Sequence, residues 1–356
     1  MLLEENISNS FISIVCLVSF IIFLIISKFS KLENFKLFLD IDFNKPQAFH
    51  EYSVPRIGGL ASIISLSIFF SSYNFVFDNK DYSYLFLSIS FFILGFLDDI
   101  KIKIKPFSRL ALMIIIMLLG LKLFNIKIDY TGFHFLNSWL ENTIFQYFFL
   151  ILCFLFIING SNLIDGFNGL LIIHLIIINS ILLYIHLSFQ EVNFSLFLTG
   201  QIFVMFCFLL FNFPISKMFM GDSGAYLFGV VTSLNVINTS IYHKEISPLF
   251  FTCLLFYLFF EVFFSFIRKI RTGRSPLRPD SNHLHMLIFN YIEKNKTIKN
   301  SNPITSIIIN LGFVLLIIPS VIFRENGLFC KYWFLLQIIA YLYAYVSFYN
   351  FTKKLN

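Results

Sequence analysis

The sequence predicts an all-α fold, a polytopic membrane bundle of about eleven transmembrane helices in one domain over residues 1–356. With 58% hydrophobic and 13% charged residues, the chain has too little polar surface to cover a soluble globule. Long runs of Ile, Leu and Phe without helix breakers suit lipid-facing helices better than the alternating pattern of an outer-membrane barrel. We therefore expect ten or eleven crossings, each a continuous apolar helix.

Each crossing needs about 17 to 25 apolar residues. On this basis the predicted helices span residues 10–27, 57–77, 82–97, 107–125, 143–160, 168–187, 194–212, 224–241, 247–267, 303–322 and 331–350. Glu4 and Glu5 precede the first run, where a secretory signal would carry Lys or Arg, so we expect this helix to be retained. The two longest connections on the inner side are residues 27–56 and 268–302, and residues 283–292 have the composition of an amphipathic interfacial helix.

Two independent charge patterns predict the orientation of these helices. If the helices alternate in direction, four polar clusters fall in connections on one side, namely residues 98–99, 162–170, 220–224 and 280–285. Of the 26 Lys and Arg residues, all lie on that same side except Lys80, Lys122, Lys127, Lys244, Arg324 and Lys331. The positive-inside rule then puts the clusters in the cytoplasm and the N-terminus outside. Topology also accounts for the positive charge, so we expect no nucleic-acid partner.

The run LGFLDDI puts two carboxylates, Asp98 and Asp99, where an apolar span ends. Acids at a membrane edge are costly, so a functional role is the first hypothesis. Paired carboxylates can hold a divalent cation or remove a proton, and Arg109 with the nearby lysines can neutralise phosphate oxygens. The alternative is a solvated loop start with ordinary inside-positive lysines.

Two further segments carry oxygen ligands. In NLIDGFNGL, the spacing of three brings Asn162, Asp165 and Asn168 to one face if the segment is helical, which suits a hard cation or a nucleotide. In MGDSG, Asp222 stands at a helix start, where its carboxylate would lie beside free backbone amides that bind phosphate and Mg²⁺. The alternative for both segments is a helix cap built from Asn, Asp, Ser and Gly.

Basic residues accompany these acids. His283 and His285 follow a strongly basic stretch that includes Arg274, and the first inner loop carries Lys45 and Arg56 beside two prolines. Two His residues without a third soft ligand argue against structural zinc, so anion binding is the functional interpretation and inside-positive charge the alternative. Taken together, the clusters indicate a site that joins a water-soluble phosphorylated donor to a lipid-borne acceptor.

Five ordered motifs resemble one family, the polyprenyl-phosphate N-acetylhexosamine-1-phosphate transferases of glycosyltransferase family 4: KPQAFHEYSVPRIGG, GFLDDI with Arg109, NLIDGFNGL, MGDSGAYLFG and GRSPLRPDSNHLH. The resemblance implies transfer of sugar 1-phosphate from a UDP-N-acetylhexosamine to undecaprenyl phosphate, with release of UMP. It also implies Mg²⁺ as cofactor with Mn²⁺ as a substitute, an active site on the cytoplasmic face of the bacterial inner membrane, contact with membrane lipids, and a homodimer by analogy.

The resemblance further implies three groups of site residues. The metal ligands would be Asp222 and Asn162. The catalytic acids would be Asp98, Asp99 and Asp165, and which of them acts as a base stays open because a lipid phosphate is already ionised near neutral pH. Phosphate and nucleotide contacts would come from Lys45, Arg109, Asn168, Arg274, His283 and His285.

Two departures from the family pattern indicate which type of enzyme within the family this sequence resembles. Many bacterial relatives have Asp where Asn168 stands and a third His where Met286 stands. The missing His argues against the phospho-N-acetylmuramoyl-pentapeptide transferase of peptidoglycan synthesis, which is the alternative, and favours an enzyme that starts O-antigen or other surface polysaccharide. A membrane transporter is the alternative from another class, but a transporter would carry charged residues near the membrane midplane. In this chain the acids cluster at one interface, and the main exception is Glu261, near the end of the helix predicted over 247–267.

Overall fold

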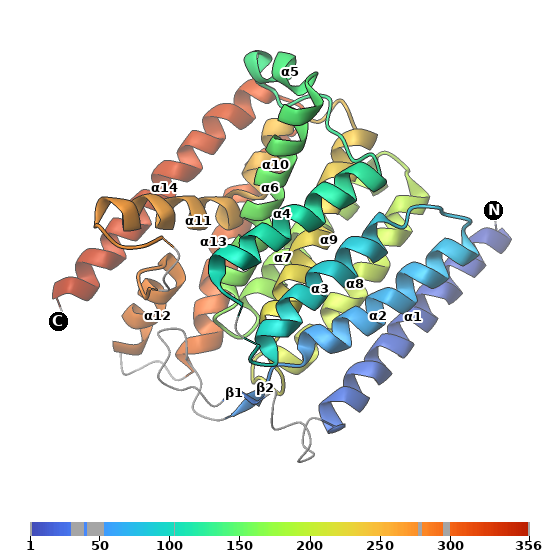
Figure 1. Ribbon diagram of the computed structural model, residues 1–356, viewed down its shortest axis with the longest axis horizontal. Helices are drawn as coiled ribbons and strands as arrows, with labels where there is room; N and C mark the ends of the chain where they lie inside the picture. The colour runs from blue at the N-terminus through green and yellow to red at the C-terminus, as the bar shows by residue number, and fades with distance from the viewer. Residues whose placement is uncertain are drawn as a thin grey trace. The chain divides into compact units, whose positions relative to one another are not determined.

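Helices make up nearly all of the regular structure, as the composition predicts (Figure 1). The computed structural model describes residues 2–29, 39–40, 53–102, 104–276, 280–294 and 300–354. Within these residues the only strands are β1 (Leu39–Asp40) and β2 (Val54–Pro55), which form an antiparallel pair. The all-helical class of a multi-pass membrane protein is therefore confirmed.

The chain divides into two units, which we describe separately. Unit 1 comprises the described residues of Met1–Ile41, Tyr52–Ile126 and Ile172–Thr239, and unit 2 those of Lys127–Leu171 and Ser240–Asn356. The helices of unit 1 are α1 (Leu2–Phe29), α2 (Gly58–Val76), α3 (Ser83–Asp99), α4 (Pro106–Leu123), α8 (Val192–Asn212), and most of α7 (Leu170–Ser188) and α9 (Gly221–Tyr242). Those of unit 2 are α5 (His134–Leu140), α6 (Thr143–Ile164), α10 (Pro248–Leu254), α11 (Phe256–Arg271), α12 (Leu284–Lys294), α13 (Ser301–Ile322) and α14 (Gly327–Lys354).

The described residues contain nine or ten candidate crossings, and the sequence predicts ten or eleven. Nine helices of the described chain are long and apolar enough to span a membrane, or ten if one bent pair counts as a span. That pair is α10 and α11, which meet at a 71° bend, so the predicted continuous helix over 247–267 is wrong. The bend has no sequence marker, because no Pro or Gly lies between Pro248 and Arg271. The helix α3 has 17 residues, at the lower limit for a crossing.

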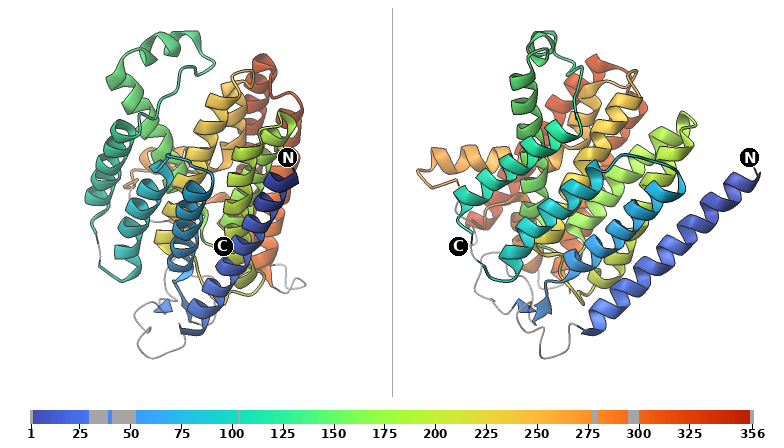
Figure 2. Two further views of the ribbon diagram at one scale, coloured as in Figure 1. Left: turned by 90° about the vertical axis from the view of Figure 1, so that its right-hand side faces the viewer. Right: turned by 45° about the vertical axis from the view of Figure 1, so that its right-hand side comes forward.

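The helix α1 begins at Leu2, eight residues before the predicted start at residue 10, and the other predicted helices form within four residues of their expected ends. The amphipathic segment 283–292 forms α12, which packs against α13 and α14. The seven-residue α5 was not predicted and lies in the connection before α6. In unit 1, α1 lies along α2 and α8 on the outside of the unit (Figure 2).

Buried amide side chains hold α9 in unit 1. Asn235 of α9 donates to Asn179 of α7 and to Gln201 of α8, each at 2.7 Å, and accepts from the hydroxyl of Tyr84 in α3 at 2.8 Å. All four side chains are fully or almost fully buried. Polar contacts of this kind hold helices together in lipid, where hydrophobic burial provides little force between them. They fix the helix whose first turn carries Asp222.

Candidate active site

The last turn of α3 carries the acid pair, and each acid has a different partner. Asp98 lies 2.6 Å from the guanidinium of Arg109 in the first turn of α4 and also accepts the amide of Ile104 at 3.3 Å. Asp99 is 3% exposed and turns toward the start of α9. A carboxylate at a helix C-terminus faces the negative end of the helix dipole, so both acids need such partners.

Asp99 caps the N-terminus of α9. Its two carboxylate oxygens accept the backbone amides of Asp222 and Ser223, both at 3.0 Å. The close approach requires Gly221, which has a φ of +74° and whose added Cβ would lie 2.6 Å from Asp99 Oδ2. The amides that the MGDSG motif was expected to offer to phosphate therefore have a protein partner, and this part of the prediction is wrong.

The Asp222 side chain remains at the surface of this cluster. One of its oxygens lies 3.5 Å from the same Arg109 nitrogen that binds Asp98. The side chains of Asp98, Arg109 and Asp222 are 16%, 26% and 24% exposed, so all three are in contact with solvent. Because Asp98, Asp99 and Asp222 outnumber Arg109, this acidic cluster suits a hard cation better than a bare phosphate.

Backbone hydrogen bonds bring the loop before α2 to the acidic cluster. The amides of Gly58 and Gly59 donate to the carbonyls of Phe219 and Met220 at 2.9 Å, and the amide of Phe219 donates to the carbonyl of Pro55 at 2.9 Å. The segment that follows Arg56 is thereby joined to the MGDSG segment. Lys45, the other predicted phosphate contact of this loop, lies outside the described residues.

In unit 2, the NLIDGFNGL segment forms a turn between two helices. The helix α6 ends at Ile164 and α7 begins at Leu170, so only Asn162 is helical, whereas Asp165 and Asn168 lie in the turn. The expected single helix face is therefore wrong. All three side chains are half-buried, and the amide of Asn168 donates to the side chain of Asn302 at 2.8 Å.

The two predicted histidines of unit 2 are both buried, whereas Arg274 is exposed. His283 lies between two carboxylates: its Nδ1 is 2.9 Å from Glu261 and its Nε2 is 3.1 Å from Asp280. Sequence reasoning gave Glu261 no role. A signal existed, because a single acid within the Phe-rich run YLFFEVFF is costly in lipid unless it has a partner.

The residues present fit a magnesium ion that substrate helps to hold. No group of three or more His, Cys, Asp or Glu side chains within the described residues is arranged to hold a metal. Mg²⁺ commonly takes one or two protein oxygens and completes its shell with substrate phosphates and water. Asp222 offers such an oxygen, while Asp99 does not, since backbone amides occupy both of its oxygens.

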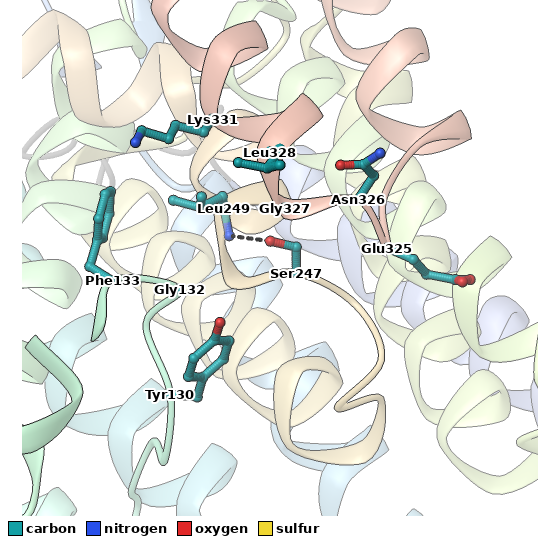
Figure 3. Close-up of a pocket in the computed structure, with 10 residues that line it drawn as sticks. All are labelled: Tyr130, Gly132, Phe133, Ser247, Leu249, Glu325, Asn326, Gly327, Leu328 and Lys331. Carbon is teal, nitrogen blue, oxygen red and sulfur yellow. Dashed lines mark hydrogen bonds between the residues drawn. The ribbon is translucent and has the colours of Figure 1, made fainter. Parts of the chain in front are cut away.

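Unit 2 also contains a hollow. It has a volume of about 770 Å³ and is lined by the start of α14, the start of α10 and the connection before α5 (Figure 3). Its charged members are Glu325 and Lys331, and no predicted site residue contributes to it.

The helices and the acidic cluster define a class of protein, a multi-pass membrane protein with a cluster of acids at its helix ends. Residues 81–240 match Glycosyl transferase family 4. This match, which includes the acid pair, Arg109 and the MGDSG segment, confirms the resemblance that the motifs indicated.

Several characterised proteins are similar to this chain. The undecaprenyl-phosphate alpha-N-acetylglucosaminyl 1-phosphate transferase of Thermotoga maritima is 26% identical over 91% of both chains. The enzyme of the same name from Escherichia coli K12 is 25% identical over 67% of this chain and 66% of its own. The phospho-N-acetylmuramoyl-pentapeptide-transferase of Staphylococcus saprophyticus is 30% identical over 55% of this chain and 64% of its own.

Proposed function

We propose that this protein transfers N-acetylhexosamine 1-phosphate from a UDP-sugar to undecaprenyl phosphate and releases UMP, as the first step of O-antigen or another surface polysaccharide. The observation that carries the proposal is the acidic cluster of Asp98, Asp99, Arg109 and Asp222, which lies within the family match. The similarity to the Thermotoga maritima enzyme over almost the whole chain supports the same acceptor.

The reaction exchanges one phosphoanhydride for another. An oxygen of the lipid phosphate forms a bond to the sugar-bearing phosphorus of the donor, and the bond from that phosphorus to the bridging oxygen breaks, with its electron pair leaving on UMP. Since bond energies nearly balance, positioning and neutralisation of charge account for most of the catalysis. Arg109 is suited to hold a phosphate oxygen, because its guanidinium is partly exposed and fixed by Asp98.

A bound Mg²⁺ would reduce the charge on the donor pyrophosphate. We propose Asp222 and Asn162 as its protein ligands, since each offers a hard oxygen. Asp98 orients Arg109, and Asp99 fixes the first turn of α9 and with it the Asp222 side chain. In this proposal the acid pair acts mainly by positioning, and the ionised lipid phosphate needs no dedicated base.

The first test is the loss of Asp222. The Asp222→Asn variant, purified in detergent with Mg²⁺, undecaprenyl phosphate and UDP-N-acetylglucosamine, should lose at least about 100-fold in UMP release because one cation ligand is weakened. Asp129→Asn serves as the matched control, since Asp129 is 74% exposed and pairs only loosely, at 3.6 Å, with Lys244. Chelation by EDTA should abolish turnover and added Mg²⁺ should restore it. Unchanged turnover of Asp222→Asn would contradict the proposal.

A second candidate is transfer of phospho-N-acetylmuramoyl-pentapeptide, which the 30% identity to the Staphylococcus saprophyticus enzyme supports. A panel of UDP-sugars distinguishes the two. UMP release with UDP-N-acetylglucosamine or UDP-N-acetylgalactosamine supports the first proposal. Release only with UDP-N-acetylmuramoyl-pentapeptide supports the second.

A further inference from the structure

Glu261 is a carboxylate within the apolar helix α11, and it is 1% exposed. A charged group in such a place is retained only when its charge and its hydrogen-bonding capacity are both satisfied. Glu261 meets this condition through three different segments of unit 2. Its Oε1 accepts from His283 Nδ1 at 2.9 Å and from the amide of Leu284 at 3.3 Å, and its Oε2 accepts from the hydroxyl of Tyr341 in α14 at 2.6 Å.

The second nitrogen of His283 has a carboxylate partner as well. His283 Nε2 lies 3.1 Å from Asp280, and Asp280 forms a two-point ion pair with Arg268 of α11 at 2.7 and 3.2 Å. An imidazole with a carboxylate oxygen at each nitrogen can donate to both only when it is protonated. Two cations and two anions then balance among Arg268, Asp280, His283 and Glu261, and we call these four residues with Tyr341 the His283 network.

The electrostatics of the loop agree with this protonation. Burial alone would lower the pKa of His283, but the hydrogen bonds to Asp280 and Glu261 raise it above its usual value. Burial also works against ionised Asp280, yet hydrogen bonds from His283 and Arg268 hold its pKa below the usual range. The geometry and the raised pKa both favour the protonated form of His283.

The imidazole ring of His285 stacks on the ring of His283. The two imidazole rings are parallel within 3° with centroids 5.4 Å apart, and burial lowers the pKa of His285 to about 3, so His285 is neutral. Its Nδ1 lies 3.4 Å from the hydroxyl of Tyr257, and its Nε2 is buried without a hydrogen-bond partner among the described residues. The ring edge packs on Phe167 of the NLIDGFNGL turn.

Two hydrogen bonds also hold the start of the connection from α11 to α12 against the last turn of α11. Lys269 donates to the carbonyl of Pro276 at 3.2 Å, and the amide of Arg274 donates to the carbonyl of Lys269 at 2.9 Å. This connection carries Arg274, His283 and His285, the residues expected on the donor side. Glu261 contacts the end of this connection from the interior of unit 2, through His283 and the amide of Leu284.

We propose that Glu261 is a positioning residue, which through His283 holds the Asp280–His285 segment and His285 itself in the conformation that binds the nucleotide-sugar donor. The inference rests on the proposed function. His283 then lies in the interior of this segment, with a carboxylate at each ring nitrogen. Of the two histidines, only His285 has a ring nitrogen, Nε2, without a hydrogen-bond partner among the described residues.

The test compares Glu261→Gln, which keeps the shape and removes the charge, with Glu261→Asp, which keeps the charge. Gln337→Leu is the control, because Gln337 is 1% exposed in the same helix as Tyr341, while its side-chain amide donates to the carbonyl of Leu316 at 3.4 Å. We expect Glu261→Gln to raise the KM for UDP-N-acetylglucosamine about tenfold with kcat little changed, since one charge-assisted hydrogen bond is lost. Glu261→Asp should recover part of the loss, and Gln337→Leu should keep the wild-type KM.

The pH profile separates positioning from general damage. The groups that face His283 are Glu261 from α11, Asp280 from its own segment, His285 from α12, and, one contact further, Arg268 and Tyr341. Without the Glu261 charge, His283 loses its proton at lower pH. The rise in KM of Glu261→Gln should therefore be larger at about pH 8.5 than at about pH 6.5.

A second readout needs no substrate. Diethylpyrocarbonate modifies neutral imidazoles, so His283 should be protected in the wild type and in Gln337→Leu and modified severalfold faster in Glu261→Gln, as measured on the peptide by mass spectrometry. A wild-type KM at both pH values with unchanged protection of His283 would overturn the inference, as would the same KM rise in Gln337→Leu. If the wild type releases no UMP with any UDP-sugar while the labelling differs as expected, the proposed function fails and the network around His283 stands.

Discussion

Asp98 and Asp99 are neighbours in the chain with different partners in the fold. Asp98 faces a guanidinium that is itself partly exposed, whereas Asp99 is buried and accepts two amides at the start of α9. The first amides of a helix have no partner within the helix, and Asp99 accepts two of them from another helix. Asp98 therefore lies at the surface of the acidic cluster, whereas Asp99 supports the cluster from within.

This division predicts different effects on stability. Asp99→Asn should lower the melting temperature of the protein in detergent by several degrees, because Asn has one acceptor oxygen for the two amides that Asp99 accepts, and a buried amide left without a partner costs about 1–3 kcal/mol. Asp98→Asn should shift it much less, since partly exposed ion pairs contribute about 1 kcal/mol or less. Thermal unfolding of both variants, followed by intrinsic fluorescence, measures the difference. Equal shifts would show that Asp99 is not a structural cap.

At the scale of elements, close helix contacts position the first turn of α9. The helix α3 crosses it at Gly95, where an added Cβ would lie 2.5 Å from the backbone of Ser223. The same turn is fixed by Asp99 and, further along α9, by the buried amides around Asn235. The Asp222 side chain is thus carried on a helix held from several sides.

Gly95→Ala should destabilise the protein by about 1–3 kcal/mol, because α3 and α9 must move apart to admit the methyl group. Gly312→Ala in α13 is the matched control, since nothing lies within 4 Å of its added Cβ. Replacing a helix-interior Gly at an open position should be neutral or stabilise by up to about 1 kcal/mol. Melting temperatures of the two variants check this, and a smaller loss in Gly95→Ala than in Gly312→Ala would contradict the close contact.

Comparison of the predicted and observed helices shows which of them a sequence pattern is sufficient to predict. Long apolar runs predicted α2, α8 and α13 closely, because length and composition are all that a crossing requires. The bend between α10 and α11 was not predictable, since its residues are uniformly apolar. The turn at Asp165 was missed for a related reason, because Asn, Asp and Gly suit both a helix end and a helix interior with functional residues.

At the scale of the whole molecule, the distribution of Lys and Arg predicts the orientation. Lys80 precedes α3 and Lys105 follows it, and both lie at exposed positions. If α3 is a crossing, these two positions lie on opposite sides of the membrane, with Lys80 outside. The 17 residues of α3 are enough for a short crossing.

Cysteine labelling tests this orientation. In a background without the five native cysteines, Lys80→Cys should react with a membrane-impermeant maleimide on intact cells, and Lys105→Cys should react only after the membrane is permeabilised. Labelling of both positions on intact cells would exclude α3 as a crossing. Labelling of Lys105→Cys alone would reverse the orientation.

The sequence by itself determined the membrane class, most helix positions and the chemical groups of the candidate site, because these depend on composition and on spacing along the chain. Only the tertiary structure decided the partners: Asp99 with the amides of α9, Arg109 between two acids, and Glu261 with His283. Those contacts join residues that lie 11 to 124 positions apart. A local pattern shows that a buried charge needs a partner, but the packing of the helices determines which partner it meets.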